Sequence, residues 1–134
     1  VSANFSDLAG FLDFAAAAAS YREAMAIYEA SLGPESHQVA EMFSSLGLSL
    51  SKLKRFDEAD ATHARSVEVF TRSLGARHAK TGAALGRRGA NLQDRGDCEA
   101  AIPYFREAKA ILAESDPNHA RILDQIRGLA HGHP

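Results

Sequence analysis

Tryptophan is absent from this chain of 134 residues, and cysteine occurs only once. The single cysteine, Cys98, cannot form a disulfide within the chain. Small extracellular domains often depend on several disulfides, so one cysteine favours a reducing compartment. We therefore expect a cytoplasmic protein.

Long apolar runs and an excess of positive charge are also missing. The segment Phe11 to Ala19 is apolar but is shorter than the roughly 18 residues needed to cross a bilayer, and no basic region precedes it as in a signal peptide. The formal net charge is −2. Nucleic acids and anionic membranes bind to concentrated positive surfaces, so we expect neither of them as the main partner.

Alanine is abundant instead, and the chain repeats itself. Ser31-Leu32-Gly33 recurs as Ser73-Leu74-Gly75, which is an offset of 73 − 31 = 42 residues. The segments Tyr21–Tyr28 and Phe105–Leu112 lie two such offsets apart and are also related. Three aligned copies at one spacing indicate a repeat protein.

Each repeat is predicted to contain two helices. Between Val39 and Leu53, apolar residues recur every three or four positions, which is the spacing of one helix face. Gly33 and Gly75 each follow a leucine and suit the left-handed residue that ends a helix. The whole pattern predicts helices near residues 3–10, 13–32, 36–53, 56–74, 77–95, 98–114 and 118–130.

An all-α solenoid of antiparallel helix hairpins follows from this pattern, because stacked hairpins bury one face on the next. We expect a single repeat domain over residues 1–134, and we expect it to be a piece of a longer protein because it begins with Val1. Its predicted parts are units at about 1–33, 34–75 and 76–116 and a capping helix at 117–130. Small residues recur at one site, where they would let helices pack closely: Ala17, Ala59 and Ala101.

Two motifs suggest a family. Leu46-Gly47, Leu50 and the step Phe56-Asp57-Glu58-Ala59 resemble the tetratricopeptide repeat signature. The 42-residue spacing and the linkers Leu32–His37 and Leu74–His78 resemble the kinesin light chain type of this repeat, in which Leu-Gly-x-x-His follows a long second helix. The resemblance covers nearly the whole chain. It implies a superhelix of about seven helices and a role in binding other proteins.

The third unit departs from this pattern. Arg88 stands at the position of Leu46 one unit earlier, where the family usually has an apolar residue. The same predicted helix contains Gly82, Gly86 and Gly89, and each interior glycine costs up to about 1 kcal/mol relative to alanine. We expect this helix to be the least stable of the array.

The resemblance also implies a concave binding groove, because the first helix of each unit lines that face in such proteins. The implied groove residues are Ser6, Glu41, Ser44, Leu48, Lys52, Ala83, Gly86, Ala90, Gln93, Asp94 and Arg127. An extended or helical peptide from a partner protein would lie in this groove, and Lys52 and Arg127 would meet a carboxylate. The alternative is that these residues are only solvated positions on exposed helix faces.

No residue set indicates catalysis, a cofactor or a metal. His37, His78 and His119 lie 41 residues apart at equivalent linkers, too far from one another to share an ion, and we expect them to form hydrogen bonds near helix starts. Cys98 has acidic neighbours on both sides, which oppose formation of a reactive thiolate. We therefore expect a protein that is not an enzyme.

Self-assembly is a second hypothesis. A solenoid exposes an apolar face at each end unless a cap covers it. Phe5, Leu8, Phe11, Leu12 and Phe14 crowd the N-terminal end, which makes this end the candidate surface for a homo-oligomer. A further alternative is that the chain is the regulatory arm of a larger multidomain protein.

Overall fold

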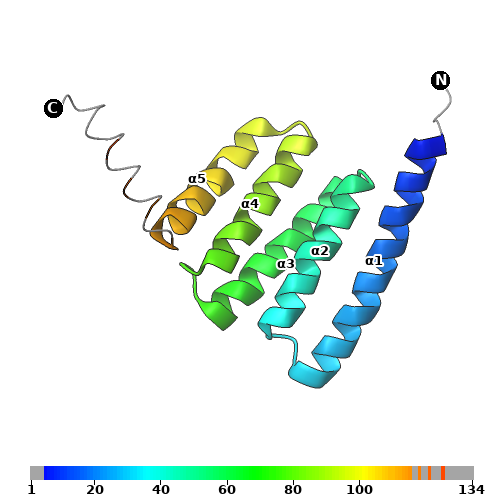
Figure 1. Cartoon of the computed structure of the whole chain (residues 1–134), viewed down its shortest axis with the longest axis horizontal. Coiled ribbons are helices and arrows are strands. Elements are labelled where there is room, and N and C mark those ends of the chain that lie inside the picture. Colours follow the sequence, from blue (N-terminus) through cyan, green and yellow to red (C-terminus); the bar gives the residue numbers. More distant parts are fainter. Residues whose placement is uncertain (1–4, 116–117, 119–120, 122–124, 126–134) are drawn as a thin grey trace.

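The computed structural model describes residues 5–115 and residues 118, 121 and 125. Residues 5–115 form five α-helices joined by short linkers. They are α1 (Phe5–Leu32), α2 (His37–Lys52), α3 (Phe56–Leu74), α4 (Ala79–Asp94) and α5 (Cys98–Ser115). The helices stand side by side in chain order, and successive helices run antiparallel (Figure 1). The prediction of an all-α array of hairpins is therefore confirmed for this part of the chain.

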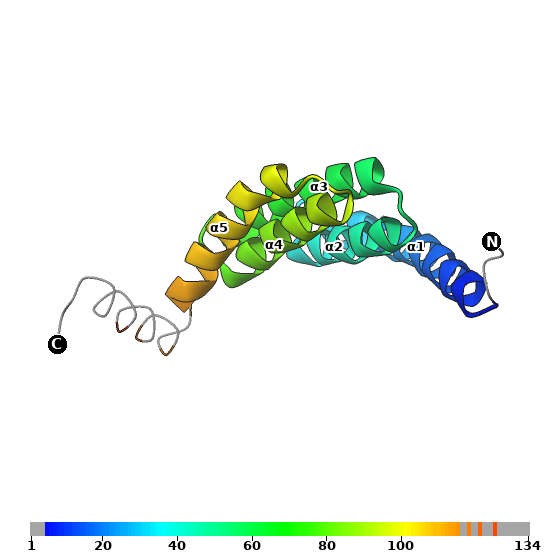
Figure 2. The same ribbon diagram turned by 90° about the horizontal axis from the view of Figure 1, so that it is seen from above.

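The row of helices is curved. Each helix contacts the next one, and α2 and α4 also contact each other, whereas α3 contacts neither α1 nor α5. The row bends toward α2 and α4, which lie on the inner side of the arch seen in Figure 2. The first helix of each hairpin therefore lines the inner side, and the second helix lies on the outer side.

The prediction of seven helices is wrong for the described residues. The ranges 3–10 and 13–32 were expected to be two helices, but α1 is continuous from Phe5 to Leu32. Gly10 is the weakest point of this stretch, but no proline or capping residue ends the helix there. A single interior glycine costs about 1 kcal/mol, which the alanine-rich continuation can offset. The expected helix 118–130 lies outside the described residues except for residues 118, 121 and 125.

Side chains cap the inner helices at equivalent positions. Ser36 accepts a hydrogen bond from the backbone N–H of Val39 at 3.3 Å, and His78 Nδ1 accepts one from the N–H of Lys80 at 3.0 Å. Because 78 − 36 = 42, the structural counterpart of His78 is Ser36 and not His37. The expectation for His78 is confirmed, but pairing it with His37 was wrong by one residue. His119 lies outside the described residues.

Left-handed residues end the helices. Gly33 has φ of 90° and Gly75 has φ of 106°, as predicted from their positions after leucine. The turn between α4 and α5 uses Gly96, with φ of 95°. The equivalent turn between α2 and α3 uses Lys54, with φ of 62°, although 96 − 54 = 42. The same turn is therefore built once with glycine and once with a strained lysine.

Small side chains hold the array together. Ala59 and Ala101 are 0% and 1% exposed, which agrees with the prediction of close helix contacts at this repeated site. Three apolar clusters lie along the row: the first joins α1, α2 and α3, the second joins α2, α3 and α4, and the third joins α4 and α5. They are Ala18, Leu46, Leu50 and Ala59; then Ala40, Val69, Phe70 and Ala84; then Leu85, Ala108 and Ile111. No single large core exists in this part of the chain, so each hairpin depends on its neighbours.

Candidate functional site

A hollow of about 350 Å³ lies between α2 and α4, with Phe70 of α3 contributing to its wall. α2 and α4 are not consecutive helices of the chain, but they contact each other directly. The residues that line it are Glu41, Met42, Ser44, Ser45, Phe70, Lys80, Ala83, Ala84 and Arg87. The lining combines an apolar floor with hydroxyl and charged groups at the rim, which suits a short peptide segment better than a large apolar ligand.

The charges at the hollow are only partly neutralised. Lys80 of α4 forms an ion pair with Glu41 of α2, which spans the hollow at one end. Arg87 is exposed and lies two turns further along α4. Among the described residues, it has no ion-pair partner. The open charge at this surface is therefore positive.

Three of the predicted groove residues meet at this hollow: Glu41, Ser44 and Ala83. Five others are exposed on α2 or α4 without lining it: Leu48, Lys52, Ala90, Gln93 and Asp94. Their exposure fits either a groove or a solvated face. Arg127 lies outside the described residues. Ser6 belongs to α1 and not to a separate first helix.

Two predicted residues face other helices. Ser44 is only 3% exposed, and its hydroxyl lies 2.6 Å from that of Ser66, which donates to the Ala40 carbonyl. It therefore ties α2 to α3. Gly86 faces α5, because a methyl group placed on it would lie 3.6 Å from the Cβ of Ala108. The groove positions implied by the family resemblance included both residues that pack against another helix and residues that are exposed to solvent.

Sequence reasoning missed Lys80, Arg87, Met42 and Ser45. A signal for Arg87 was present, because it lies one helical turn after Ala83, which was predicted. Ser45 is its counterpart one repeat earlier, since 87 − 45 = 42. Ser44 lines the hollow from a buried position, whereas Gly86 does not line it, and the more exposed lining residues are their neighbours Ser45 and Arg87.

Two tetratricopeptide repeat family models match the chain, one over residues 38–114 and one over residues 13–38. The first match spans more than half of the chain and covers α2 through α5 almost completely. The chain belongs to the tetratricopeptide repeat family. Comparison with curated proteins found no match. Tetratricopeptide repeats are modules of protein–protein interaction, and the hollow between α2 and α4 lies on the inner face of this one.

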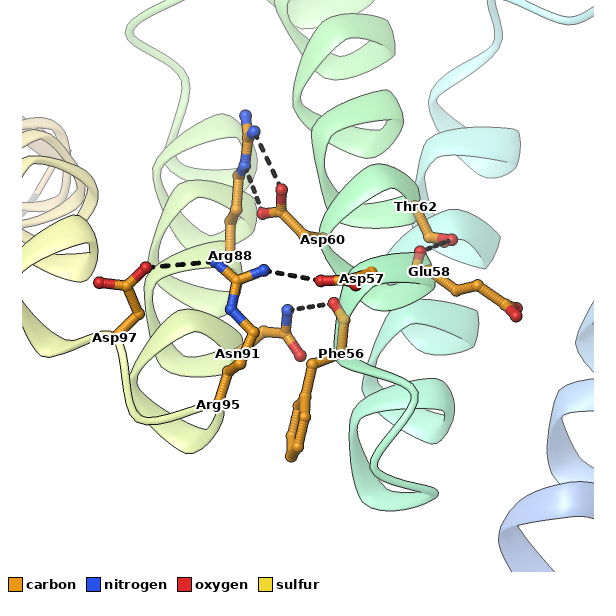
Figure 3. A network of polar contacts seen from close by, with 9 residues as sticks. All are labelled: Phe56, Asp57, Glu58, Asp60, Thr62, Arg88, Asn91, Arg95 and Asp97. Carbon is orange, nitrogen blue, oxygen red and sulfur yellow. Dashed lines mark hydrogen bonds and ion pairs between the residues drawn. The ribbon is translucent and has the colours of Figure 1, made fainter.

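A polar network joins the two repeats at the seam between α3 and α4 (Figure 3). Asn91 is 1% exposed, and its side-chain Nδ2 donates to the backbone carbonyl of Phe56 at 2.9 Å. Arg95 bridges Asp57 at 2.8 Å and Asp97 at 3.3 Å. Asn91 near the end of α4 and Arg95 directly after α4 reach the start of α3, so they fix the register of one repeat on the next.

Arg88 has a structural role at the same seam. Its Nε donates to Asp60 of α3 at 2.8 Å, and its guanidinium carbon lies 4.7 Å from the ring centre of Tyr104 in α5. Asp60 and Arg88 are both about three-quarters buried. These contacts explain why an arginine stands where the family usually has an apolar residue. Arg88 pairs with Asp60 on α3 and stacks on the ring of Tyr104 on α5. Arg87, and not Arg88, is the arginine left at the inner surface.

His63 is the most perturbed titratable group of the described residues. It is 1% exposed, lies against Gly47, and its Nδ1 has no hydrogen-bond partner within the described part of the chain. Burial lowers the pKa of His63 to about 4, with Arg87 and Arg88 adding to the decrease and Asp60 opposing it. A neutral imidazole surrounded by helix seams serves packing, and nothing reactive lies within its reach.

The part of the chain that the structure describes bears on three other kinds of site: metal centres, reactive thiols and membrane spans. No group of three or more His, Cys, Asp or Glu side chains gathers there in an arrangement that could hold a metal ion. Cys98 is a free, exposed thiol at the start of α5. None of the helices over residues 5–115 is both long and apolar enough to span a membrane.

Proposed function

We propose that this tetratricopeptide repeat protein is a non-catalytic interaction scaffold that holds a segment of a partner protein, extended or helical, along the inner face of α2 and α4. The observation that supports this most is the hollow between these helices, which is lined by Arg87, a residue without an ion-pair partner in the described part of the chain. A concave surface built on rigid helices can hold a segment with little loss of its own entropy.

The lining suggests the chemistry of the segment. Ala83, Ala84 and Met42 present small apolar surface, while Ser45 and Arg87 offer a hydroxyl and a guanidinium. A segment with a carboxylate beside a small apolar side chain would match both the apolar surface and the guanidinium, since arginine binds carboxylates through two parallel hydrogen bonds. Lys80 is already paired with Glu41, so Arg87 supplies the open positive charge.

A peptide array tests this proposal. Peptides that bind the wild-type chain should lose binding to Arg87→Glu and to Ala83→Trp, because the first change repels a carboxylate and the second fills the hollow. Both positions are exposed, so circular dichroism should show an unchanged fold. Binding should also weaken with added salt, as expected for an exposed charge pair.

The matched control is Arg106→Glu on α5, an exposed arginine outside the hollow that receives the same change of charge. It should bind as the wild type does. If all binders tolerate both changes at the hollow, or if Arg106→Glu weakens them equally, the inner face does not hold the segment.

We extend the proposal to the organisation of the protein. The equivalent caps Ser36 and His78 support a 42-residue repeat of the kinesin light chain type. On this view residues 1–134 form one repeat domain with units at 1–33, 34–75 and 76–116. The expected capping helix at 117–130 lies outside the described residues except for residues 118, 121 and 125. We place the protein in the cytoplasm, without a cofactor, and a regulatory arm of a multidomain protein fits the same features.

Self-assembly is the second candidate function, and exposed apolar side chains at the start of α1 favour it. Leu8, Phe11 and Leu12 are 50%, 52% and 57% exposed. Light scattering over a hundredfold range of protein concentration would detect an oligomer, and Phe11→Asp should reduce it. A mass that stays monomeric over the whole range would end this candidate.

A further inference from the structure

Two second helices of the array carry the same residues on one face. Phe105, Ala108 and Ile111 of α5 correspond to Tyr21, Ala24 and Ile27 of α1, since 105 − 21 = 84, which is two repeat lengths. The match is an aromatic residue, an alanine and an isoleucine at the same spacing. What covers this face on α5 therefore indicates what fits it on α1.

On α5, a row of glycines covers the face. Methyl groups placed on Gly82, Gly86 and Gly89 of α4 would lie 2.8 Å from Ile111 Cγ2, 3.6 Å from Ala108 Cβ and 3.1 Å from Phe105 Cε1. The glycines follow the spacing i, i+4, i+7, so they form one stripe along α4. Ile111 is consequently 0% exposed.

The α2–α3 hairpin repeats this arrangement with other small residues. Gly47 of α2 lies against His63 of α3, the counterpart of Phe105. Ala40 belongs to the same cluster as Val69, the counterpart of Ile111, and Val69 is also 0% exposed. Two of the three second helices thus have this face covered by an antiparallel helix with small residues along its seam.

On α1 the face is open. Ile27 is 65% exposed, against 0% for both of its counterparts, Val69 and Ile111. Tyr28 does not distinguish the helices, because it is 38% exposed and its counterpart Leu112 on α5 is 41% exposed. The reason is the continuous α1. The residues before Ala17 extend the helix in line and do not fold back as a first helix, and α2 is the only described helix that contacts α1. The face is continuous with the seam that α1 already forms with α2, through Tyr21 and Met25.

The charge pattern of α5 is not repeated on this face. Near the start of α4, Arg77 pairs with Glu114 of α5. The counterpart of Glu114 on α1 is Ala30, since 114 − 84 = 30. The match between the two faces is therefore apolar, and it requires no charge on a docked helix.

We propose that the face of α1 formed by Ala17, Tyr21, Ala24 and Ile27 is a docking site for a single helix of a partner protein. The helix runs antiparallel to α1 and carries glycine or alanine at positions i, i+4 and i+7. It takes the place that α4 has on α5. This site lies on a different helix from the hollow, so it goes beyond the inner-face function proposed above.

A synthetic peptide of residues 77–95, which carries the three glycines of α4, is the probe. Added to the intact chain, it should bind saturably, as measured by fluorescence anisotropy of a labelled peptide. A peptide with Gly86→Leu should bind roughly tenfold more weakly or worse, because a bulky side chain at the seam keeps the helices apart. Binding of peptides in general, without this difference between the two probes, contradicts the proposal.

Variants of the chain locate the site. Ile27→Asp should weaken binding of the wild-type peptide by roughly tenfold or more. The matched control Ile102→Asp changes another exposed isoleucine, on α5, and should have no effect. Ile27 is 65% exposed, so its replacement should leave the circular dichroism spectrum unchanged.

Three results would overturn the proposal. The first is the absence of saturable binding by the wild-type peptide. The second is equal binding by Ile27→Asp and wild type, or loss of binding on Arg87→Glu, which would place the peptide in the hollow. The third is a dimer of the chain that Ile27→Asp dissociates and the peptide does not, which would make a second copy the occupant. None of these results bears on the proposed binding at the inner face of α2 and α4, which the peptide array tests separately.

Discussion

Gly47 of α2 lies against the imidazole ring of His63 in α3. A methyl group placed on Gly47 would come within 2.6 Å of Cε1 and 2.8 Å of both ring nitrogens. Real side chains do not approach so closely, and the ring is enclosed, with 1% of His63 exposed. The contact sets the distance between the two helices of this hairpin.

Replacement of Gly47 by alanine should therefore destabilise the protein. Alanine is the better helix former by about 1 kcal/mol, but overpacking against a buried ring costs about 1–3 kcal/mol. We expect a net loss of about 1 kcal/mol, read from urea denaturation followed by circular dichroism. An increase in stability would show that the ring can move aside.

Gly86→Ala should have the opposite effect. Its methyl group would meet Ala108 Cβ at 3.6 Å, an ordinary van der Waals contact. The change should thus stabilise the fold by about 0.5–1 kcal/mol, through helix propensity and a less flexible unfolded chain. The same urea denaturation measures the change in stability. Gly82→Ala is the comparison, because its methyl group would lie 2.8 Å from Ile111 and should destabilise the fold.

His63 should make stability fall in mild acid. Its pKa is about 4 in the folded state, whereas an unperturbed histidine has a pKa of 6.5, so in mild acid the unfolded chain binds a proton that the folded chain does not bind. Its contribution is complete above the unfolded pKa of about 6.5 and is lost as pH falls toward about 4. Between pH 7 and pH 5 the loss from this residue should be on the order of 2 kcal/mol.

The control for this pH dependence is His63→Phe. Phenylalanine occupies the equivalent position on α5 as Phe105, against Gly89, so the seam can accept it. Denaturation midpoints of this variant should depend less on pH over the same range. A pH profile identical to that of the wild type would assign the acid sensitivity to other groups.

Lys54→Gly should stabilise the turn between α2 and α3. Lys54 has φ of 62°, and its counterpart Gly96 has φ of 95° in the equivalent turn. A lysine in this region is strained by about 1 kcal/mol relative to glycine. We expect a gain of about 0.5–1 kcal/mol after the greater flexibility of glycine in the unfolded chain is subtracted. Gly96→Lys is the reciprocal change and should destabilise by a similar amount.

Residue types at short range along the chain determined most of the fold. The 42-residue repeat, the helices from His37 onward and the left-handed ends at Gly33 and Gly75 all follow from residue types at short range. Apolar spacing and glycine stops act within one or two helical turns, so a single sequence displays them directly. The family match over residues 38–114 has the same origin.

Only the tertiary structure decided which neighbour each residue meets. Ser44 contacts α3, Gly86 lies against α5, and Arg87 lines the hollow on the inner surface. The residue types alone do not distinguish these three positions. Arg88 pairs with Asp60, 28 residues earlier, which no local pattern anticipates. Contacts between residues of different helices depend on how the helices cross, and helix crossing is a property of the packed array.

The start of α1 is the clearest case. Helix propensity over Phe5–Leu32 is equally compatible with a hairpin and with one long helix, because Gly10 permits a turn but does not require one. The structure has the long helix, and this leaves Ile27 exposed where its repeat counterparts are buried. The sequence alone determines that this face is apolar, whereas the path of the chain in three dimensions determines that no helix of residues 5–115 covers it.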